Sequence, residues 1–441
     1  MRFGVDVLHL TKSGTFSYGE LAKLKHIQYL NTKKLNKLTD IKFRNIIKHA
    51  YTHTPFYRAL YDQEKIEITN IKGVNDAHKL PIITKKMLRK DFPEKVIAPN
   101  EFKRALFDRT SGSTGEPFEF YKDERSTPKR RSSYMLFNTW MGVGPHEKHL
   151  QISSPKAHTR YKTLSNQIFR KSHISSLMIK RKNIRNVVSK INNISPTYFE
   201  GYSASLYNTA YLMEEQGLEL KNNPKAIIAT SEDLIESYRK KIQDVFKSPV
   251  YNRYGSREFS GAVAQECNLF EGSHINSSFF HIDLVDEEGT SVAEDERGRI
   301  IITDLLNRVM PFIRYDLGDS AIRGPEKGEC GRTFPIIRNI KGKSNFFLIS
   351  KNDERTPIET IQSYLFQKYA PTVNNFQFLH NKKGDLILYI VPARGFTDKI
   401  LKEMYRYLDS TLENFTINIE LVEDILHTRA GKTPYFIVNF S

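Results

Sequence analysis

Residues 109–117 read Arg-Thr-Ser-Gly-Ser-Thr-Gly-Glu-Pro, and this stretch decides how the rest of the sequence is interpreted. Its glycines let the backbone approach a ligand closely, so that successive N–H groups can form an anion-binding nest. The hydroxyls of Ser111, Ser113 and Thr114 add further donors. Such a loop suits a polyphosphate, although it lacks the Lys-Ser or Lys-Thr that ends a Walker loop. Taken alone, it could equally be a flexible connection.

Three more motifs follow in the sequence, and each is weak by itself. In residues 251–258, Tyr254 and Gly255 could stack an aromatic face on a base, and Glu258 could hold Mg²⁺. Asp319 ends the stretch 311–319 beside a glycine, where a carboxylate can accept the two hydroxyls of a ribose. Lys432, after Gly431 in a polar terminal loop, can bring a point charge to a phosphate. Ordinary turns and an exposed lysine would explain each of them equally well in isolation.

Together, the order and spacing of these motifs resemble the adenylate-forming superfamily. The resemblance is strongest to its phenylacetate–coenzyme A ligase branch and to the CapK-type proteins of bacterial capsule loci. It runs nearly end to end, because further segments look like signatures of that branch. They are residues 54–58 (Thr-Pro-Phe-Tyr-Arg), 80–85 (Leu-Pro-Ile-Ile-Thr-Lys), 201–203 (Gly-Tyr-Ser), 230–232 (Thr-Ser-Glu) and 314–319 (Arg-Tyr-Asp-Leu-Gly-Asp).

The resemblance implies an α/β fold with two parts. Residues 1–341 would form a large ATP- and acyl-binding domain of several subdomains. Residues 342–441 would form a small, mobile α+β domain that carries the catalytic lysine. The boundary lies where Gly342-Lys343-Ser344-Asn345 resembles the family's hinge, usually Gly-Arg-x-Asp.

The resemblance also implies roles for individual residues. Tyr254, with Gly255, would stack on adenine, Asp319 would bind the ribose, and Glu258 would hold Mg²⁺. Lys432 would be catalytic together with Glu258 and Thr114, and Lys343 would lie at the hinge. The ATP phosphates would lie in the loop of Ser111, Gly112, Ser113, Thr114 and Gly115, and the adenine would also contact Ser231 and Glu232. The sequence departs from the family where Glu116-Pro117-Phe118 replaces a lysine near the proline, and where Lys343 and Asn345 replace Arg and Asp.

The implied reaction is ATP-dependent, AMP-forming activation of a carboxylic acid followed by acyl transfer to coenzyme A. An alternative acceptor is an amine or a glycan hydroxyl in capsule polysaccharide biosynthesis. A third hypothesis, from another class, is a non-catalytic basic protein that binds nucleic acid or a membrane surface.

The charge distribution bears on that third hypothesis. Lys and Arg total 67 against 50 Asp and Glu, a net charge of +17, which should attract anions. Between residues 148 and 199 there are 11 Lys or Arg and no acid, so this basic stretch could dock an anionic surface or be an ordinary solvated face. Few aromatic residues interleave with it, which argues against nucleic-acid binding. We expect a cytoplasmic location, because the N-terminus lacks the apolar run of a secretory signal. The expected oligomeric state is a monomer or a homodimer.

Two cysteines in so long a chain exclude a disulfide scaffold and favour a reducing compartment. Relatives in the branch show a Glu-Cys followed by His and a later Cys-x-Cys-Gly-Arg-Thr, ligands that could hold a structural Zn²⁺. Here Cys267, His274 and Cys330 remain, and Gly328 stands in place of the first cysteine of the later pair. Either Glu266 or Glu329 could complete the site, or the site could be lost.

Periodicity predicts several elements. Phe43, Ile46, Ile47 and Ala50 mark one face of a helix that should end before Thr54-Pro55. We expect strands at 279–285, 300–302, 385–391, 417–422 and 435–440, and a turn at 286–289. A helix from Thr397-Asp398 should bury Leu401, Met404, Tyr405, Leu408 and Leu412.

Overall fold

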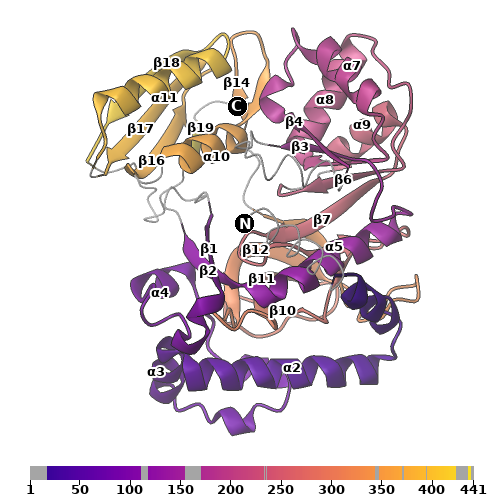
Figure 1. Cartoon of the computed structure of the whole chain (residues 1–441), viewed down its shortest axis with the longest axis vertical. Helices are drawn as coiled ribbons and strands as arrows, with labels where there is room; N and C mark the ends of the chain where they lie inside the picture. Colours follow the sequence, from indigo (N-terminus) through magenta and orange to yellow (C-terminus); the bar gives the residue numbers. More distant parts are fainter. Residues whose placement is uncertain are drawn as a thin grey trace, which may run out of the picture. The chain divides into compact units, whose positions relative to one another are not determined.

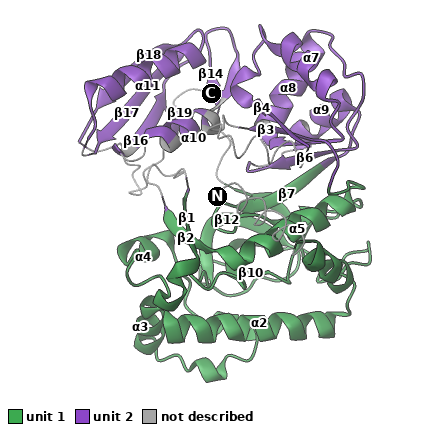
Figure 2. Ribbon diagram, viewed as in Figure 1, with its two compact units in different colours: residues 1–109, 119–145, 251–342 green, residues 110–118, 146–250, 343–441 purple. Residues whose placement is uncertain are grey.

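The computed structural model describes residues 17–110, 118–153, 170–232, 234, 236–342, 347–369, 372–393, 395–423 and 436–438 (Figure 1). The chain divides into two compact units (Figure 2). Unit 1 comprises residues 1–109, 119–145 and 251–342, and unit 2 comprises 110–118, 146–250 and 343–441. The division into domains 1–341 and 342–441 stays a prediction.

Unit 1 begins with helices that its sequence periodicity predicts. Helix α2 (Thr32–His53) ends one residue before Thr54, and Phe43, Ile46, Ile47 and Ala50 are all buried, as expected. Asn31 caps its N-terminus by accepting a hydrogen bond from the Lys34 N–H. The further helices are α3 (Pro55–Gln63), α4 (Lys85–Lys90) and α5 (Thr127–Trp140), with short 3₁₀ turns at Ile68–Asn70, Val74–Lys79, Pro99–Arg104 and Glu124–Ser126.

The main sheet of unit 1 is antiparallel throughout, in the order β10-β11-β12-β13-β9-β8-β7. The strands are β7 (Val250–Ser256), β8 (Gly261–Glu266), β9 (Ser273–Ile275), β10 (Phe280–Val285), β11 (Arg297–Asp304), β12 (Tyr315–Arg323) and β13 (Ile336–Lys341). A separate hairpin pairs β1 (Ala105–Arg109) with β2 (Glu119–Asp123). The predicted strands at 279–285 and 300–302 are present, and the second is longer than predicted, since β11 already begins at Arg297.

Unit 2 contains a parallel sheet in the order β6-β5-β3-β4. Its strands are β3 (His149–Ser153), β4 (Lys171–Ser175), β5 (Tyr198–Tyr202) and β6 (Ala226–Thr230). Helices α7 (Ile184–Ile194), α8 (Ser203–Glu215) and α9 (Glu236–Phe246) and the short 3₁₀ turn Ser176–Met178 accompany them. Residues 226–229 are fully buried, the near-continuous apolar run that a parallel strand covered on both faces requires.

The last hundred residues of unit 2 form a four-stranded sheet in the order β18-β17-β16-β19, with a core of their own. The elements are β14 (Phe347–Ile349), β15 (Arg355–Pro357), α10 (Ile358–Tyr369), β16 (Val373–His380), β17 (Asp385–Pro392), α11 (Asp398–Thr411), β18 (Thr416–Leu421) and β19 (Phe436–Val438). Strand β17 alternates buried and half-buried residues, which is the period-2 pattern of a strand.

The predicted apolar face of α11 needs one correction. Thr397 caps the helix and Met404, Leu408 and Leu412 are buried, but Tyr405 is 44% exposed. Successive side chains on a helix point about 100° apart, so Tyr405 lies outside the buried face that contains Met404. The half-buried aromatic is Tyr407, whose ring stacks on Tyr364 with centroids 3.9 Å apart.

A buried ion pair ties α5 to the end of β11 in unit 1. The Arg130 guanidinium lies 2.5 Å from the Asp304 carboxylate and also donates to the Phe259 carbonyl oxygen at 2.8 Å. The side chains of Arg130 and Asp304 are 5% and 0% exposed. Removing one partner of such a pair leaves an uncompensated buried charge.

We therefore expect Asp304→Asn to lower the free energy of unfolding of unit 1 by about 3–5 kcal/mol. The matched control is Asp295→Asn, whose partner Arg338 and own side chain are 38% and 74% exposed, and which should cost at most about 1 kcal/mol. Urea unfolding followed by the fluorescence of Trp140 reports on unit 1, since Trp140 is the single tryptophan of the chain. Equal midpoints for the two variants would contradict the assignment.

Candidate active site

The predicted base- and ribose-binding residues of unit 1 are joined by a hydrogen bond. Tyr254 lies on β7 and Asp319 on β12, and the Tyr254 hydroxyl donates to Oδ2 of Asp319 over 2.8 Å. Burial, reinforced by this carboxylate, raises the pKa of Tyr254 well above its usual range. The phenol therefore stays protonated and acts as the donor, and a carboxylate with about four acceptor positions can accept further hydroxyls.

Gly255 allows the two strands beside this pair to approach closely. A Cβ at position 255 would collide with the carbonyl oxygen of Gly261 on β8. The register between β7 and β8 also shifts between Tyr254 and Gly255. A residue without a side chain is therefore required here, and it sets the position of Tyr254 at the end of β7.

Glu258 lies in the turn after β7 and its side chain is 2% exposed. The Lys85 ammonium is 3.3 Å from its Oε1, and the Tyr315 hydroxyl donates to the same oxygen at 3.4 Å. Burial, the largest single influence, raises the pKa of Glu258, but the charge of Lys85 together with the hydrogen bonds to the carboxylate outweighs it, and the pKa lies below the usual value. Glu258 is therefore a buried, ionised carboxylate, the oxygen ligand that a hard cation such as Mg²⁺ prefers.

Lys85 reaches Glu258 because its segment extends the sheet beside β12. Ile83 forms a parallel bridge with Tyr315: its N–H donates to the Arg314 carbonyl at 2.8 Å, and its own carbonyl accepts from the Asp316 N–H at 2.9 Å. Thr84 then caps α4, so Lys85 begins that helix. Sequence reasoning quoted Lys85 only as part of a family signature and missed its contact with Glu258, because the two residues lie far apart in the sequence.

The other N-terminal signature also supports the approach to β12. The Tyr57 hydroxyl donates to the Pro311 carbonyl at 2.9 Å and accepts from the Ile313 N–H at 3.1 Å. Arg314, which follows directly, donates to the carbonyls of Ala77 and Leu80 at 2.8 and 2.9 Å. The two N-terminal signatures thus hold the strand that carries Tyr315 and Asp319.

In unit 2, the predicted adenine-contacting segment lies beside the Gly-Tyr-Ser segment. Ser231 and Glu232 follow β6, and Ser203 follows its parallel neighbour β5. The Ser203 hydroxyl donates to the Glu232 carbonyl at 3.2 Å. Ligands of open α/β sheets bind at the carboxyl ends of strands, which is where these residues lie.

Several predicted site residues lie outside the described residues. They are the phosphate loop of Ser111, Gly112, Ser113, Thr114 and Gly115, the hinge residue Lys343, and Lys432. Their roles stay predictions, as do the roles assigned to Tyr254, Gly255, Glu258, Asp319, Ser231 and Glu232.

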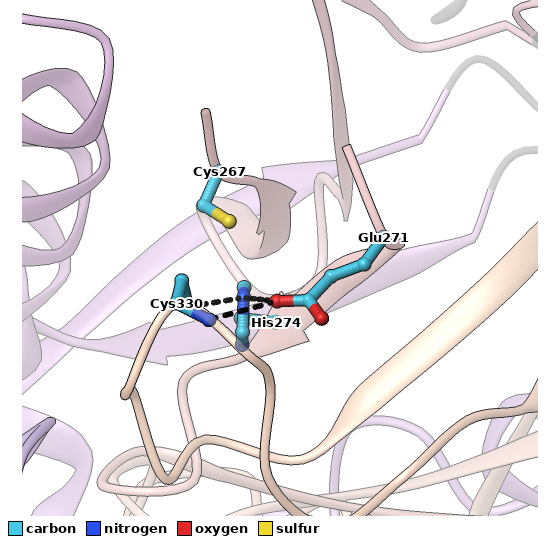
Figure 3. Close-up of side chains that lie close together, drawn as sticks. All are labelled: Cys267, Glu271, His274 and Cys330. Atoms are coloured by element: carbon cyan, nitrogen blue, oxygen red, sulfur yellow. Dashed lines mark hydrogen bonds and ion pairs between the residues drawn. The ribbon is translucent and has the colours of Figure 1, made fainter. Parts of the chain in front are cut away.

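A second cluster of chemically active side chains lies elsewhere in unit 1 (Figure 3). The potential ligand atoms of Cys267, Glu271, His274 and Cys330 all lie within 4.8 Å of one another. Cys267 directly follows β8. Glu271 lies just before β9, and His274 lies within it. Cys330 lies in the loop before β13, which pairs with β9.

The carboxylate in this cluster is not the one expected. Glu266 and Glu329 were the predicted fourth ligands, and Glu271 takes that place instead. The Glu266 carboxylate accepts a hydrogen bond from the Asn252 N–H at 2.7 Å, because adjacent residues of an extended segment point to opposite faces. Glu329 contributes its backbone N–H, which donates to Oε2 of Glu271 at 2.9 Å.

The described part of the basic stretch finds partners within unit 2. Lys180 and Lys182 both pair with Glu413, and Arg181 pairs with Glu215 at 2.7 Å. These three cations therefore stabilise the unit internally, and the docking of an anionic surface stays a prediction. In the part of the chain that the structure describes, no helix combines the length and apolarity needed to span a bilayer.

Comparison with solved structures identifies the fold. A structure of 2-hydroxyisobutyryl-CoA ligase, in complex with 2-HIB-AMP and CoA in its thioesterification state, matches with a TM-score of 0.61 and 17% identity over 94% of this chain and 92% of that one. The fold is thus that of the adenylate-forming CoA ligases, and the predicted α/β fold class is confirmed.

The sequence relatives are more particular. The family model of the CapK C-terminal domain matches residues 348–439. Protein CapK of Staphylococcus aureus is 23% identical over 93% of this chain and 92% of its own length. The phenylacetate-coenzyme A ligase of Thermus thermophilus is 24% identical over 82% of this chain and 81% of its own. The resemblance drawn from the motifs, to the CapK and phenylacetate–coenzyme A ligase branch, is therefore confirmed.

The contact between Lys85 and Glu258 predicts a pH effect. Lys85→Met removes the charge that lowers the pKa of Glu258 and leaves burial, which raises it. We expect the acid limb of the kcat/KM profile, measured by pyrophosphate release, to move to higher pH.

Lys79→Met is the control for this shift, since Lys79 is 46% exposed and pairs with Asp76 away from Glu258. Its acid limb should coincide with that of the wild type. An unmoved acid limb in Lys85→Met would show that Lys85 does not set the ionisation of Glu258.

Proposed function

We propose that this protein activates a carboxylic acid with ATP, forming an acyl-AMP and pyrophosphate, and then transfers the acyl group to coenzyme A. The observation that carries the proposal is the arrangement in unit 1. There the bonded pair Tyr254–Asp319 and the buried, ionised Glu258 lie on or beside β7 and β12. The comparisons support it, because phenylacetate-coenzyme A ligases and a CoA ligase with bound acyl-AMP and CoA are similar to this chain.

The chemistry explains why such a site needs fixed positive charge. A carboxylate is a poor electrophile, because its leaving group would be oxide. Attack of the carboxylate oxygen on the α-phosphorus of ATP expels pyrophosphate and leaves AMP as the leaving group. The thiol of coenzyme A then attacks the acyl carbon, the C–O bond to AMP breaks, and the thiol proton is lost to solvent. The first transition state spreads negative charge over the phosphates, so cations near them lower the barrier.

Each predicted site residue has one role in binding ATP or in adenylation. Tyr254 would stack on the adenine, the segment of Ser231 and Glu232 would contact it, and Asp319 would accept the ribose hydroxyls. Residues 111–115 would cradle the phosphates, and Lys432 would meet the charge that develops during adenylation.

A magnesium ion fits the environment of Glu258. The carboxylate is ionised and buried, and a cation already lies 3.3 Å from it in the form of Lys85. Bound Mg²⁺ would supply additional positive charge to the phosphates. Glu258 would hold it, while Lys85 and the Tyr315 hydroxyl keep the carboxylate oriented.

The match of the C-terminal region to the CapK family model is the reason to test a second kind of acyl acceptor. The CapK C-terminal model covers residues 348–439, and Protein CapK matches 93% of the chain. Transfer of the activated acyl group to an amine or a glycan hydroxyl, in capsule polysaccharide biosynthesis, is therefore the alternative to transfer to coenzyme A.

The direct test is a panel of carboxylic acids scored by pyrophosphate release with ATP–Mg²⁺, with coenzyme A or with amino sugars as acceptors. We expect release with at least one acid, and a loss of roughly 10²–10³-fold in rate for Glu258→Gln, which removes one charge at nearly constant shape.

Glu101→Gln is the matched control, because Glu101 is also a buried, cation-paired carboxylate of unit 1 and should leave the rate unchanged. Absence of ATP binding at millimolar concentration by calorimetry would refute adenylation. Wild-type turnover of Glu258→Gln at limiting Mg²⁺ would remove Glu258 from the metal site.

Lys432 is expected to serve only the first half-reaction, because the resemblance implies that the C-terminal part rotates between the two steps. Lys432→Ala should abolish acyl-AMP formation and spare transfer from a supplied acyl-AMP to the acceptor. The sequence predicts a polar, solvent-exposed loop at Lys432, and substitution of such a lysine should change stability by no more than about 0.5 kcal/mol. Both half-reactions are measured separately, with a melting curve.

Lys402→Ala, an exposed lysine of α11, is the control and should leave both steps intact. Equal loss of both half-reactions in a folded Lys432→Ala protein would mean that Lys432 does not act by rotation. Loss of neither would exclude it from the site.

A further inference from the structure

The cluster of Cys267, Glu271, His274 and Cys330 combines two thiols, an imidazole and a carboxylate in unit 1. The His274 Nε2 lies 3.4 Å from the Cys330 Sγ and 3.8 Å from Oε1 of Glu271. With Zn–S and Zn–N bonds of about 2.3 and 2.0–2.1 Å, neighbouring ligands of a tetrahedral zinc lie about 3.3–3.8 Å apart. The two separations from His274 fall in this range, and all four ligand atoms lie within 4.8 Å of one another.

The histidine is already oriented as a ligand. Its Nδ1 lies 3.0 Å from the Phe334 carbonyl oxygen, a partner that can only accept, so the proton resides on Nδ1. The lone pair of Nε2 then points toward the sulfur and the carboxylate. The Trp140 ring packs edge-on against the imidazole with centroids 5.5 Å apart, which holds the ring plane. Outer contacts of this kind are typical of metal-bound histidines.

Hydrogen bonds also orient the Glu271 carboxylate. Oε2 of Glu271 accepts from the Glu329 N–H at 2.9 Å, and Oε1 lies 3.4 Å from the Cys330 N–H. Its side chain is 16% exposed, whereas His274 is fully buried. Two backbone donors thus fix Glu271 over the cysteine that belongs to the same cluster (Figure 3).

Gly328 explains why a glutamate can occupy this place. A Cβ at position 328 would lie 2.7 Å from Cε1 of His274 and closer still to Oε1 of Glu271. Any side chain at 328 would therefore point at the ligand atoms and displace the carboxylate. A side chain at 328 and the Glu271 carboxylate exclude each other.

We propose that Glu271 is the fourth ligand of a structural Zn²⁺ site with Cys267, His274 and Cys330, and that glycine at 328 provides the room it needs. The metal would join the β8–β9 connection to the loop before β13 and so stabilise unit 1. This inference concerns stability and metal content, and it stands or falls independently of the adenylation reaction.

The test measures metal on the full-length protein, purified under reducing conditions so that the two cysteines stay thiols. Zinc content is determined by mass spectrometry, and affinity by competition with a chromophoric chelator. We expect one equivalent in the wild type. Glu271→Ala should weaken zinc binding by at least about 10–100-fold, the range for loss of a contact even outside the ligand shell. Glu329→Gln, the neighbouring carboxylate that contributes only its backbone, is the matched control and should bind as the wild type.

The exclusion between positions 271 and 328 gives a sharper readout. The double variant Glu271→Ala/Gly328→Cys should regain tight binding. With Co²⁺ in place of zinc, its thiolate charge-transfer absorption should exceed that of the wild type, because a third sulfur has joined. Gly328→Cys alone should bind more weakly than the double variant, because the Glu271 carboxylate is still in the way.

The outcomes separate cleanly. A wild type that takes up no zinc or cobalt, or a Glu271→Ala protein of unchanged affinity, overturns the proposal. If Glu271→Ala does not fold, Glu271→Gln is used instead, since its carbonyl oxygen can still accept the two backbone hydrogen bonds. Unchanged zinc affinity in that folded variant would equally overturn it. Pyrophosphate release is recorded in parallel, so failure of the adenylation proposal shows as absent turnover in a protein with normal metal content.

Discussion

The burial of an ionised carboxylate at Glu258 is the constraint on which the candidate site of unit 1 depends. Taking a lone carboxylate out of water costs several kcal/mol even after relaxation, so the fold must supply a partner. Lys85 is that partner, and the bridge between Ile83 and Tyr315 brings the start of α4 beside Glu258. One N-terminal signature therefore reaches Glu258 directly through Lys85, and the other acts indirectly, through the contacts that Tyr57 makes just before β12.

The same strand couples the cation side of the site to the nucleoside side. β12 carries Tyr315, which contacts Glu258, and four residues later Asp319, which accepts from Tyr254. A displacement of β12 would thus disturb the predicted metal ligand and the predicted ribose ligand together. The contacts of Tyr57 with the Pro311 carbonyl and the Ile313 N–H therefore bear on both predicted ligands, although residues 54–58 are remote in sequence.

Sequence patterns correctly predicted those features that depend only on residues close together in the sequence. The face of α2 through Phe43 and Ala50, its end before Thr54-Pro55 and the cap at Thr397 follow from periodicity and capping, and the structure has them. The prediction that Tyr405 lies on the buried face of α11 was wrong, because a pattern of apolar residues displaced by one position still has the spacing of an amphipathic helix. The motif order led to the fold class, which comparison with a solved CoA ligase confirms.

The pairing of Lys85 with Glu258 could not be predicted in this way, because it depends on a bridge between Ile83 and Tyr315, which lie far apart in sequence.

The fourth member of the cluster with Cys267, His274 and Cys330 shows the same limit. Glu266 and Glu329 adjoin the two cysteines in sequence, so sequence proximity favoured them. Glu266, however, ends β8, and because neighbours in an extended chain point to opposite faces, its carboxylate is directed away from Cys267 and toward the Asn252 N–H. Glu329 lies in a turn and donates its backbone N–H to Glu271. Glu271 instead enters from the connection between β8 and β9, four residues from Cys267 and three from His274.

The sequence feature that could have indicated Glu271 is the glycine at position 328, which has no side chain. Gly328 matters only once the loop before β13 is placed against β9, because only then does the room it leaves coincide with the Glu271 carboxylate. The room beside the cluster is thus visible only in the folded chain, where a Cβ at position 328 would meet the Glu271 carboxylate and the His274 ring.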